Sequence, residues 1–161
     1  MSIEWRNVMS VGDPTVDGDH KHLIDLINAF ETSISGEIDH RKIARVLLGL
    51  VQYTGEHFAR EEELQLKVRY PYYESHRKQH RDVLRQLQHV LTEYTEAHGV
   101  VQDSMIREIS RFLKDWLVGH IIESDLRMKP YIEKMRAEQA AFRRGRRPSP
   151  PPLGLKPPQS L

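Results

Sequence analysis

The chain of 161 residues is long enough for one domain with a buried core and a tail. It contains no cysteine, which excludes disulfides, zinc–thiolate sites, iron–sulfur clusters and thiol nucleophiles. The net charge of +1 is unevenly distributed: residues 143–161 carry five basic side chains and no acid, so residues 1–142 sum to −4. We therefore expect the folded part to bind no nucleic acid.

The chain shows no sign of membrane insertion or export. No apolar stretch approaches the ~20 residues that a transmembrane helix needs. Residues 1–7 lack a hydrophobic run behind a basic start, so they do not resemble a secretory signal. These features predict a cytoplasmic protein with no membrane span.

The first sixteen residues predict an irregular arm, because they contain Gly12 and Pro14 and show no helical periodicity. Trp5 in this arm is expected to pack against the body of the domain. A first helix is predicted from about Asp17 to about residue 35. Its apolar face includes His20.

A second helix is predicted from an N-cap at Asp39 to the break at Tyr70-Pro71, because the residue before a proline disfavours helical geometry. Its apolar stripe is the clearest in the chain. The stripe becomes polar only near its end, where it carries His57, Phe58 and Glu61.

In the third helix the polar residues precede the apolar stripe, whereas in the fourth they follow it, as in the second. The third carries His76 and His80 before its apolar residues and is expected to stop at Gly99. The fourth begins near residue 102 and carries His120 and Asp125 at its far end. Pro130 is expected to end or kink it, with a short helical piece following to about residue 143.

Four helices joined by short connections predict an all-α, antiparallel up-down-up-down four-helix bundle. We expect an arm at 1–16 packing on the bundle, the bundle at 17–142, and a disordered basic, proline-rich tail at 143–161. A tail of this composition can dock a partner, a membrane surface or nucleic acid, but we favour a solvated terminus without a binding role. The bundle itself is expected to be a monomer or a weak oligomer.

Antiparallel order brings the start of the first and third helices and the end of the second and fourth to one end of the bundle. Five histidines and two carboxylates occupy those places: His20, His57, Glu61, His76, His80, His120 and Asp125. A single one of them is explained by ordinary core packing or by a solvated helix face. All seven together predict a buried site for two metal ions. Burying two carboxylates without a compensating charge costs on the order of several kcal/mol, and metal cations would remove that cost. Imidazole with carboxylate suits iron, zinc, copper or nickel, with iron favoured.

The motif layout over roughly residues 3 to 135 resembles the bacterial hemerythrins, a family of non-heme di-iron oxygen-binding proteins. The matching motifs are Asp17-x-x-His20-x-x-Leu23, His57-Phe58-x-x-Glu61-Glu62, Tyr70-Pro71, His76-x-x-x-His80, and Trp116-Leu117-x-x-His120 with Asp125. The resemblance implies one iron on His76, His80 and His120 and a second on His20 and His57. It also implies that Glu61, Asp125 and an oxo or hydroxo group bridge the two ions (Fe2+/Fe3+), with dioxygen as the exchangeable ligand.

Four apolar residues near the ligands are expected to form the walls of an oxygen pocket, and they also suit plain core packing: Phe58, Trp116, Leu117 and Ile121. Two positions depart from the family pattern, with Gln65 at a usual methionine and Arg69 at a common glycine. Gln65 is expected to face solvent, with exposure to the pocket as the alternative. The remaining histidines are expected at the surface: His22, His40, His89 and His98.

The resemblance favours reversible dioxygen binding, for storage, delivery or buffering, over enzymatic activity. Two alternatives use the same scaffold. One is a di-iron enzyme that turns over peroxide or nitric oxide. The other is an oxygen or redox sensor, for which the sequence offers only the tail as an output segment.

Overall fold

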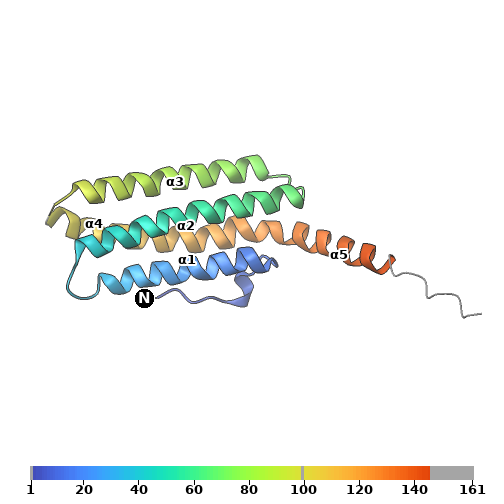
Figure 1. Cartoon of the computed structure of the whole chain (residues 1–161), viewed down its shortest axis with the longest axis horizontal. Coiled ribbons are helices and arrows are strands. Elements are labelled where there is room, and N and C mark those ends of the chain that lie inside the picture. Colours follow the sequence, from blue (N-terminus) through green and yellow to red (C-terminus); the bar gives the residue numbers. More distant parts are fainter. Residues whose placement is uncertain (1, 99, 146–161) are drawn as a thin grey trace, which may run out of the picture.

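The computed structural model describes residues 2–98 and 100–145. Four long helices form an antiparallel bundle: α1 (Pro14–Ser33), α2 (His40–Lys67), α3 (Tyr73–Glu96) and α4 (Val100–Gly119). Helix α1 contacts α2 and α4, and α3 contacts the same two helices (Figure 1). The predicted up-down-up-down bundle is confirmed. Gly99 and residues 146–161, which include most of the predicted tail, lie outside the described residues.

The fourth helix of the bundle is followed by two short helical turns and a further helix that extends beyond the bundle. A π-helical turn, η2 (His120–Ser124), and a 3-10 turn, η3 (Asp125–Met128), join α4 to α5 (Lys129–Gly145). Pro130 is the second residue of α5, so it lies in the first turn, where proline costs no helical hydrogen bond. Helix α5 extends past the bundle and includes Arg143 and Arg144, which the sequence had placed in the tail (Figure 1).

Helix α1 begins at Pro14, three residues before the predicted start at Asp17. Asp13 is the N-cap, and its carboxylate accepts hydrogen bonds from the Thr15 and Val16 amides at 3.0 and 3.1 Å. The prediction took Pro14 as part of the arm, whereas proline is well suited to the first helical position. Helix α2 has its predicted N-cap at Asp39.

The N-terminal arm lies along α1 and is fixed by two sets of polar contacts. The amide and carbonyl of Ile3 both pair with the Asn28 side chain at 2.8 Å. Asp17 accepts hydrogen bonds from the Val11 amide and the Ser10 hydroxyl. Trp5 packs against the main core cluster, with its ring 6.5 Å from the ring of His20. The arm therefore covers the bundle beside one of the candidate ligands.

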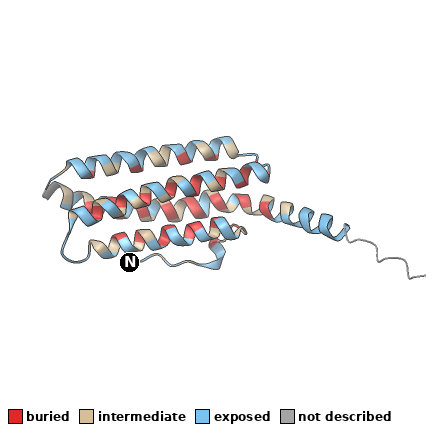
Figure 2. Ribbon diagram, viewed as in Figure 1, coloured by how far each residue is buried: buried red, intermediate tan, exposed pale blue. Residues whose placement is uncertain are grey.

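Buried residues follow the inward faces of the four helices, as the coloured ribbon in Figure 2 shows. The main core cluster includes Leu23, Phe30, Leu50, Leu113 and Leu117. A second, smaller cluster closes the end of the bundle from which α5 departs, and includes Val11, Leu64, Met128 and Ile132. None of the helices in the described ranges has the length and hydrophobicity that a membrane crossing requires.

Candidate metal centre

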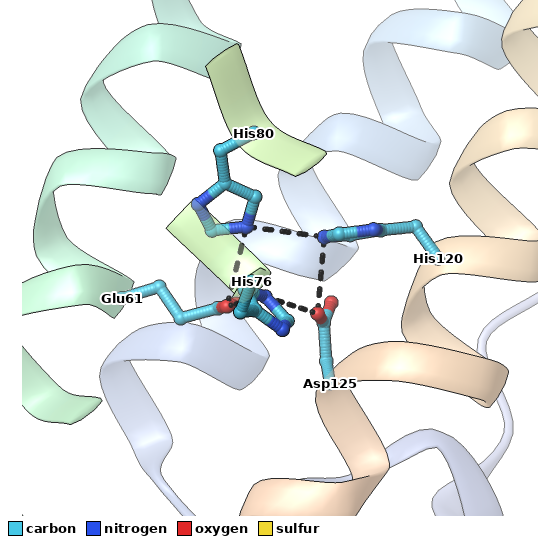
Figure 3. Close-up of side chains that lie close together, drawn as sticks. All are labelled: Glu61, His76, His80, His120 and Asp125. Atoms are coloured by element: carbon cyan, nitrogen blue, oxygen red, sulfur yellow. Dashed lines mark hydrogen bonds and ion pairs between the residues drawn. The ribbon is translucent and has the colours of Figure 1, made fainter. Parts of the chain in front are cut away.

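All seven predicted ligands meet inside the bundle, and all are buried. They form two overlapping groups that share Glu61 and Asp125. The three-histidine group adds His76, His80 and His120 to the two carboxylates, as Figure 3 shows, and the two-histidine group adds His20 and His57. Within each group one candidate ligand atom per residue lies within 4.8 Å of the others.

The π-helical turn explains how His120 and Asp125 can both face the site. Residues five apart on a regular α-helix point in different directions, since each residue turns the chain by about 100°. In η2 the amide of Asp125 donates to the carbonyl of His120, five residues back. This wider turn brings the Asp125 carboxylate beneath the His120 ring, with His120 Nε2 3.1 Å from Asp125 Oδ1.

The Glu61 carboxylate faces both groups, one oxygen to each. Its Oε1 lies 2.7 Å from His76 Nε2 and 3.5 Å from His80 Nε2. Its Oε2 lies 3.6 Å from His57 Nε2 and 3.8 Å from His20 Nε2. A carboxylate held in this way can bridge two cations.

The two oxygens of the Asp125 carboxylate also face different histidine groups. Its Oδ1 lies 3.1 Å from His120 Nε2 and 3.2 Å from His76 Nε2, whereas its Oδ2 lies 3.1 Å from His20 Nε2. In the three-histidine group the Nε2 atoms of His80 and His120 also face each other at 3.1 Å. Nitrogen atoms aimed at one point together with carboxylate oxygens form a natural set of metal ligands.

In the metal-free protein, protons on histidine compensate the buried carboxylates. Burial alone would lower the pKa of His20 and of His76, but hydrogen bonds to Asp125 and Glu61 outweigh it and raise both to about 9. Burial raises the pKa of each carboxyl, yet the histidines around them hold the pKa of Glu61 and of Asp125 well below the usual range. A histidine must lose such a proton before it can ligate a metal ion, so cation binding would replace these protons.

The donor set passes a simple test for metal binding. Several inward-facing atoms are fully buried and, although they lie near one another, make no well-oriented hydrogen bond among the described residues: His20 Nε2, His76 Nε2, Glu61 Oε2, and Oδ1 and Oδ2 of Asp125. Leaving such groups unpaired costs about 1–3 kcal/mol each. Coordination by cations would satisfy all of them at once, and imidazole with carboxylate suits iron.

Asp19 is a buried carboxylate beside the site, and the sequence analysis did not identify it as a site residue. It accepts hydrogen bonds from Tyr53 Oη at 2.7 Å and from Arg60 Nε and Nη2 at 2.8 and 3.0 Å, and its Oδ2 lies 3.4 Å from His57 Nδ1. Although burial alone would raise the pKa of Asp19, these partners hold it well below the usual range. Asp19 thus orients the His57 ring so that Nε2 faces Glu61.

A similar outer contact orients His80, whose Nδ1 lies 3.0 Å from Glu62 Oε1. The Phe58 ring stacks on the His80 ring with centroids 3.7 Å apart, and the Trp116 ring stacks on His120 at 5.7 Å. The other two predicted wall residues, Leu117 and Ile121, are fully buried in the main core cluster. Phe58 and Trp116 therefore lie against the ligands, whereas Leu117 and Ile121 belong to the core.

The expectation that Gln65 faces solvent is wrong, because Gln65 is completely buried. Its Nε2 lies 3.1 Å from Glu61 Oε1 and 3.0 Å from Met128 Sδ. Position 65 follows Glu61 by four residues, and this helical spacing places both side chains on one face.

Three of the four remaining histidines are exposed as predicted: His22, His89 and His98. His40 differs, because its side chain is only 30% exposed. Its Nδ1 lies 2.7 Å from Tyr94 Oη and its Nε2 lies 3.1 Å from Asp103 Oδ1, so it joins α2 to α3 and α4 at the end of the bundle away from the metal centre.

These features define a helical bundle with a buried histidine- and carboxylate-rich site for metal ions. Comparison with known proteins agrees. The family model of the hemerythrin HHE cation binding domain matches residues 11–132. The chain therefore belongs to the hemerythrin family.

Several proteins with hemerythrin names are similar to most of this chain. A bacteriohemerythrin of Pseudomonas paraeruginosa is 29% identical over 121 residues, covering 75% of each chain. A hemerythrin-like protein of Naegleria gruberi is 30% identical over 125 residues, covering 78% of this chain and 89% of that protein. The crystal structure of a wild-type hemerythrin has a TM-score of 0.67 and 24% identity, covering 80% of this chain and 95% of that one, which supports the fold.

Proposed function

We propose that this protein binds dioxygen reversibly at a buried two-iron centre and so stores, delivers or buffers oxygen without turning it over. The observation that carries the proposal is the division of the two carboxylates, each of which presents one oxygen to the three-histidine group and the other to the two-histidine group. A carboxylate arranged in this way is suited to contact two neighbouring cations at once.

In this proposal His76, His80 and His120 would hold one iron, His20 and His57 would hold the other, and Glu61 and Asp125 would be shared by both. The two-histidine group supplies one protein ligand fewer, so an exchangeable ligand would bind on that side. When bound, the iron pair supplies electrons that dioxygen takes up and returns.

The protein's own part is to keep the site dry and rigid. Phe58 and Trp116 pack their rings on the histidines, and Leu117 and Ile121 fill the core beside them. Excluding water and stray protons slows side reactions that would trap the iron in its oxidised form. Asp19 and Glu62 hold the His57 and His80 rings in place from outside.

The test is a cycle of optical spectra on the iron-loaded, anaerobically reduced protein before oxygen, after oxygen and after its removal. We expect a charge-transfer band that appears with oxygen and disappears when oxygen is withdrawn. Irreversible conversion to a ferric form, or continuous consumption of oxygen, would favour the enzyme or sensor alternative instead.

Two histidine variants make the test specific to the site. His57→Ala removes one of only two histidines of the two-histidine group and should abolish the reversible band. His89→Ala removes an exposed histidine of α3 that pairs with Glu93 and should leave the band unchanged. Equal behaviour of the two variants would contradict the assignment.

A further inference from the structure

The buried amide of Gln65 is a polar group in otherwise apolar surroundings. It lies on α2 one turn after Glu61, between Leu64 and Val68 of the second core cluster. No part of its side chain is exposed to solvent. A buried amide without hydrogen-bond partners destabilises a fold, so the partners of Gln65 determine whether this position is tolerated.

The donor end of this amide points at the metal centre. Gln65 Nε2 lies 3.1 Å from Glu61 Oε1 and 3.0 Å from Met128 Sδ, whereas Gln65 Oε1 has no partner among the described residues. The reverse orientation would place the amide oxygen against a carboxylate oxygen, and two acceptors repel each other. Both N–H groups of the amide therefore find an acceptor, one on each side.

The contacted oxygen is the one that faces the three-histidine group, since Glu61 Oε1 also lies 2.7 Å from His76 Nε2. Met128, the second acceptor, ends the 3-10 turn that begins at Asp125. Gln65 thus connects the helix that carries one bridging carboxylate to the segment that carries the other.

We propose that Gln65 is a positioning residue which donates a hydrogen bond to the bridging Glu61 carboxylate and thereby favours the reduced state of the iron pair. This inference rests on the proposed two-iron function. A carboxylate bound to Fe2+ keeps more of its negative charge than one bound to Fe3+, so a hydrogen bond to it is stronger in the reduced state. Loss of the donor then favours oxidation.

The decisive variant is Gln65→Met, which retains a long, unbranched side chain but cannot donate. In an anaerobic redox titration of the iron-loaded protein, the equilibrium between the reduced and the oxidised iron pair should shift toward the oxidised form by about tenfold. This shift corresponds to ~59 mV for a one-electron step. Conversion to the ferric form in air should become correspondingly faster. Gln52→Met, at an exposed position of the same helix, should change neither quantity.

Met128→Leu separates hydrogen bonding from packing. It alters the same apolar cluster but leaves the Gln65–Glu61 contact in place, so it should shift the potential far less than Gln65→Met. An unchanged potential in Gln65→Met, or equal shifts in Gln65→Met and Met128→Leu, would overturn the inference.

Failure of the wild-type protein to retain two irons would refute the proposed function instead, and the hydrogen bond can still be tested without metal. In metal-free protein the side-chain amide protons of Gln65 should resonate downfield of those of Gln52 and exchange more slowly with solvent. Matching shifts and exchange rates would overturn the assigned contact independently of iron.

Discussion

Asp19 offers the sharpest test of how the metal centre is supported. Asp19→Ala would leave the Tyr53 hydroxyl, the Arg60 guanidinium and His57 Nδ1 without their shared acceptor. The carboxylate is only 8% exposed, whereas Arg60 is 37% exposed and can regain part of its hydration. Breaking a buried pair costs ~3–5 kcal/mol when neither partner is solvated. With solvent screening of Arg60 we expect a loss of about 2–3 kcal/mol in the free energy of unfolding.

Denaturant unfolding of the metal-free protein, followed by circular dichroism, measures this loss. Glu56→Ala is the matched control, because Glu56 also pairs with Arg60, at 3.7 Å, but is 64% exposed. Removal of an exposed pair should change stability by less than about 0.5 kcal/mol. We also expect iron affinity to fall by roughly 10–100-fold in Asp19→Ala alone, since His57 loses its orienting partner. Equal effects of the two substitutions would refute the reasoning.

Further predictions concern the ligands and the two residues with positive φ among those described. His120→Ala should reduce iron retention below two ions per chain and destabilise the protein, because it removes a ligand and one partner of buried Asp125; unchanged iron content would exclude His120 as a ligand. In the metal-free protein, the pKa of His20 and His76 is about 9, against 6.5 when unfolded, so their contribution to stability is complete below 6.5 and is lost as the pH rises through 9. The denaturation midpoint should therefore fall over that range without metal and change much less with iron bound; equal pH profiles would contradict this account. Arg69 adopts a left-handed conformation, with φ of 55°, at the end of α2, so Arg69→Gly should raise the free energy of unfolding by about 1 kcal/mol. Gly12 has a φ of 86°, so Gly12→Ala should lower the free energy of unfolding.

Helical periodicity predicted most of the fold and much of the site, for identifiable physical reasons. The pairs His57 with Glu61 and His76 with His80 are four residues apart, so regular helices place each pair on one face. The spacing of five between His120 and Asp125 has no such explanation in a regular helix. Their contact depends on the π-helical turn, which residue type alone does not specify.

The interactions that the sequence analysis did not predict join residues that are distant in the chain. Asp19 is separated from Tyr53 by 34 residues and from Arg60 by 41, so only the packing of α1 on α2 reveals the cluster. The contact of His40 with Tyr94 spans 54 residues and was missed for the same reason. Gln65 differs, because its spacing of four from Glu61 already indicated the buried face, and only its polarity suggested solvent.

The most direct test of the two-metal centre is an anaerobic titration of metal-free protein with ferrous iron, with bound metal counted per chain. The shared carboxylates predict two Fe2+ per chain in the wild type and fewer than two in Glu61→Ala, which removes a bridge to both groups. A wild-type chain that binds only one iron, or two irons retained in Glu61→Ala, would contradict the central claim.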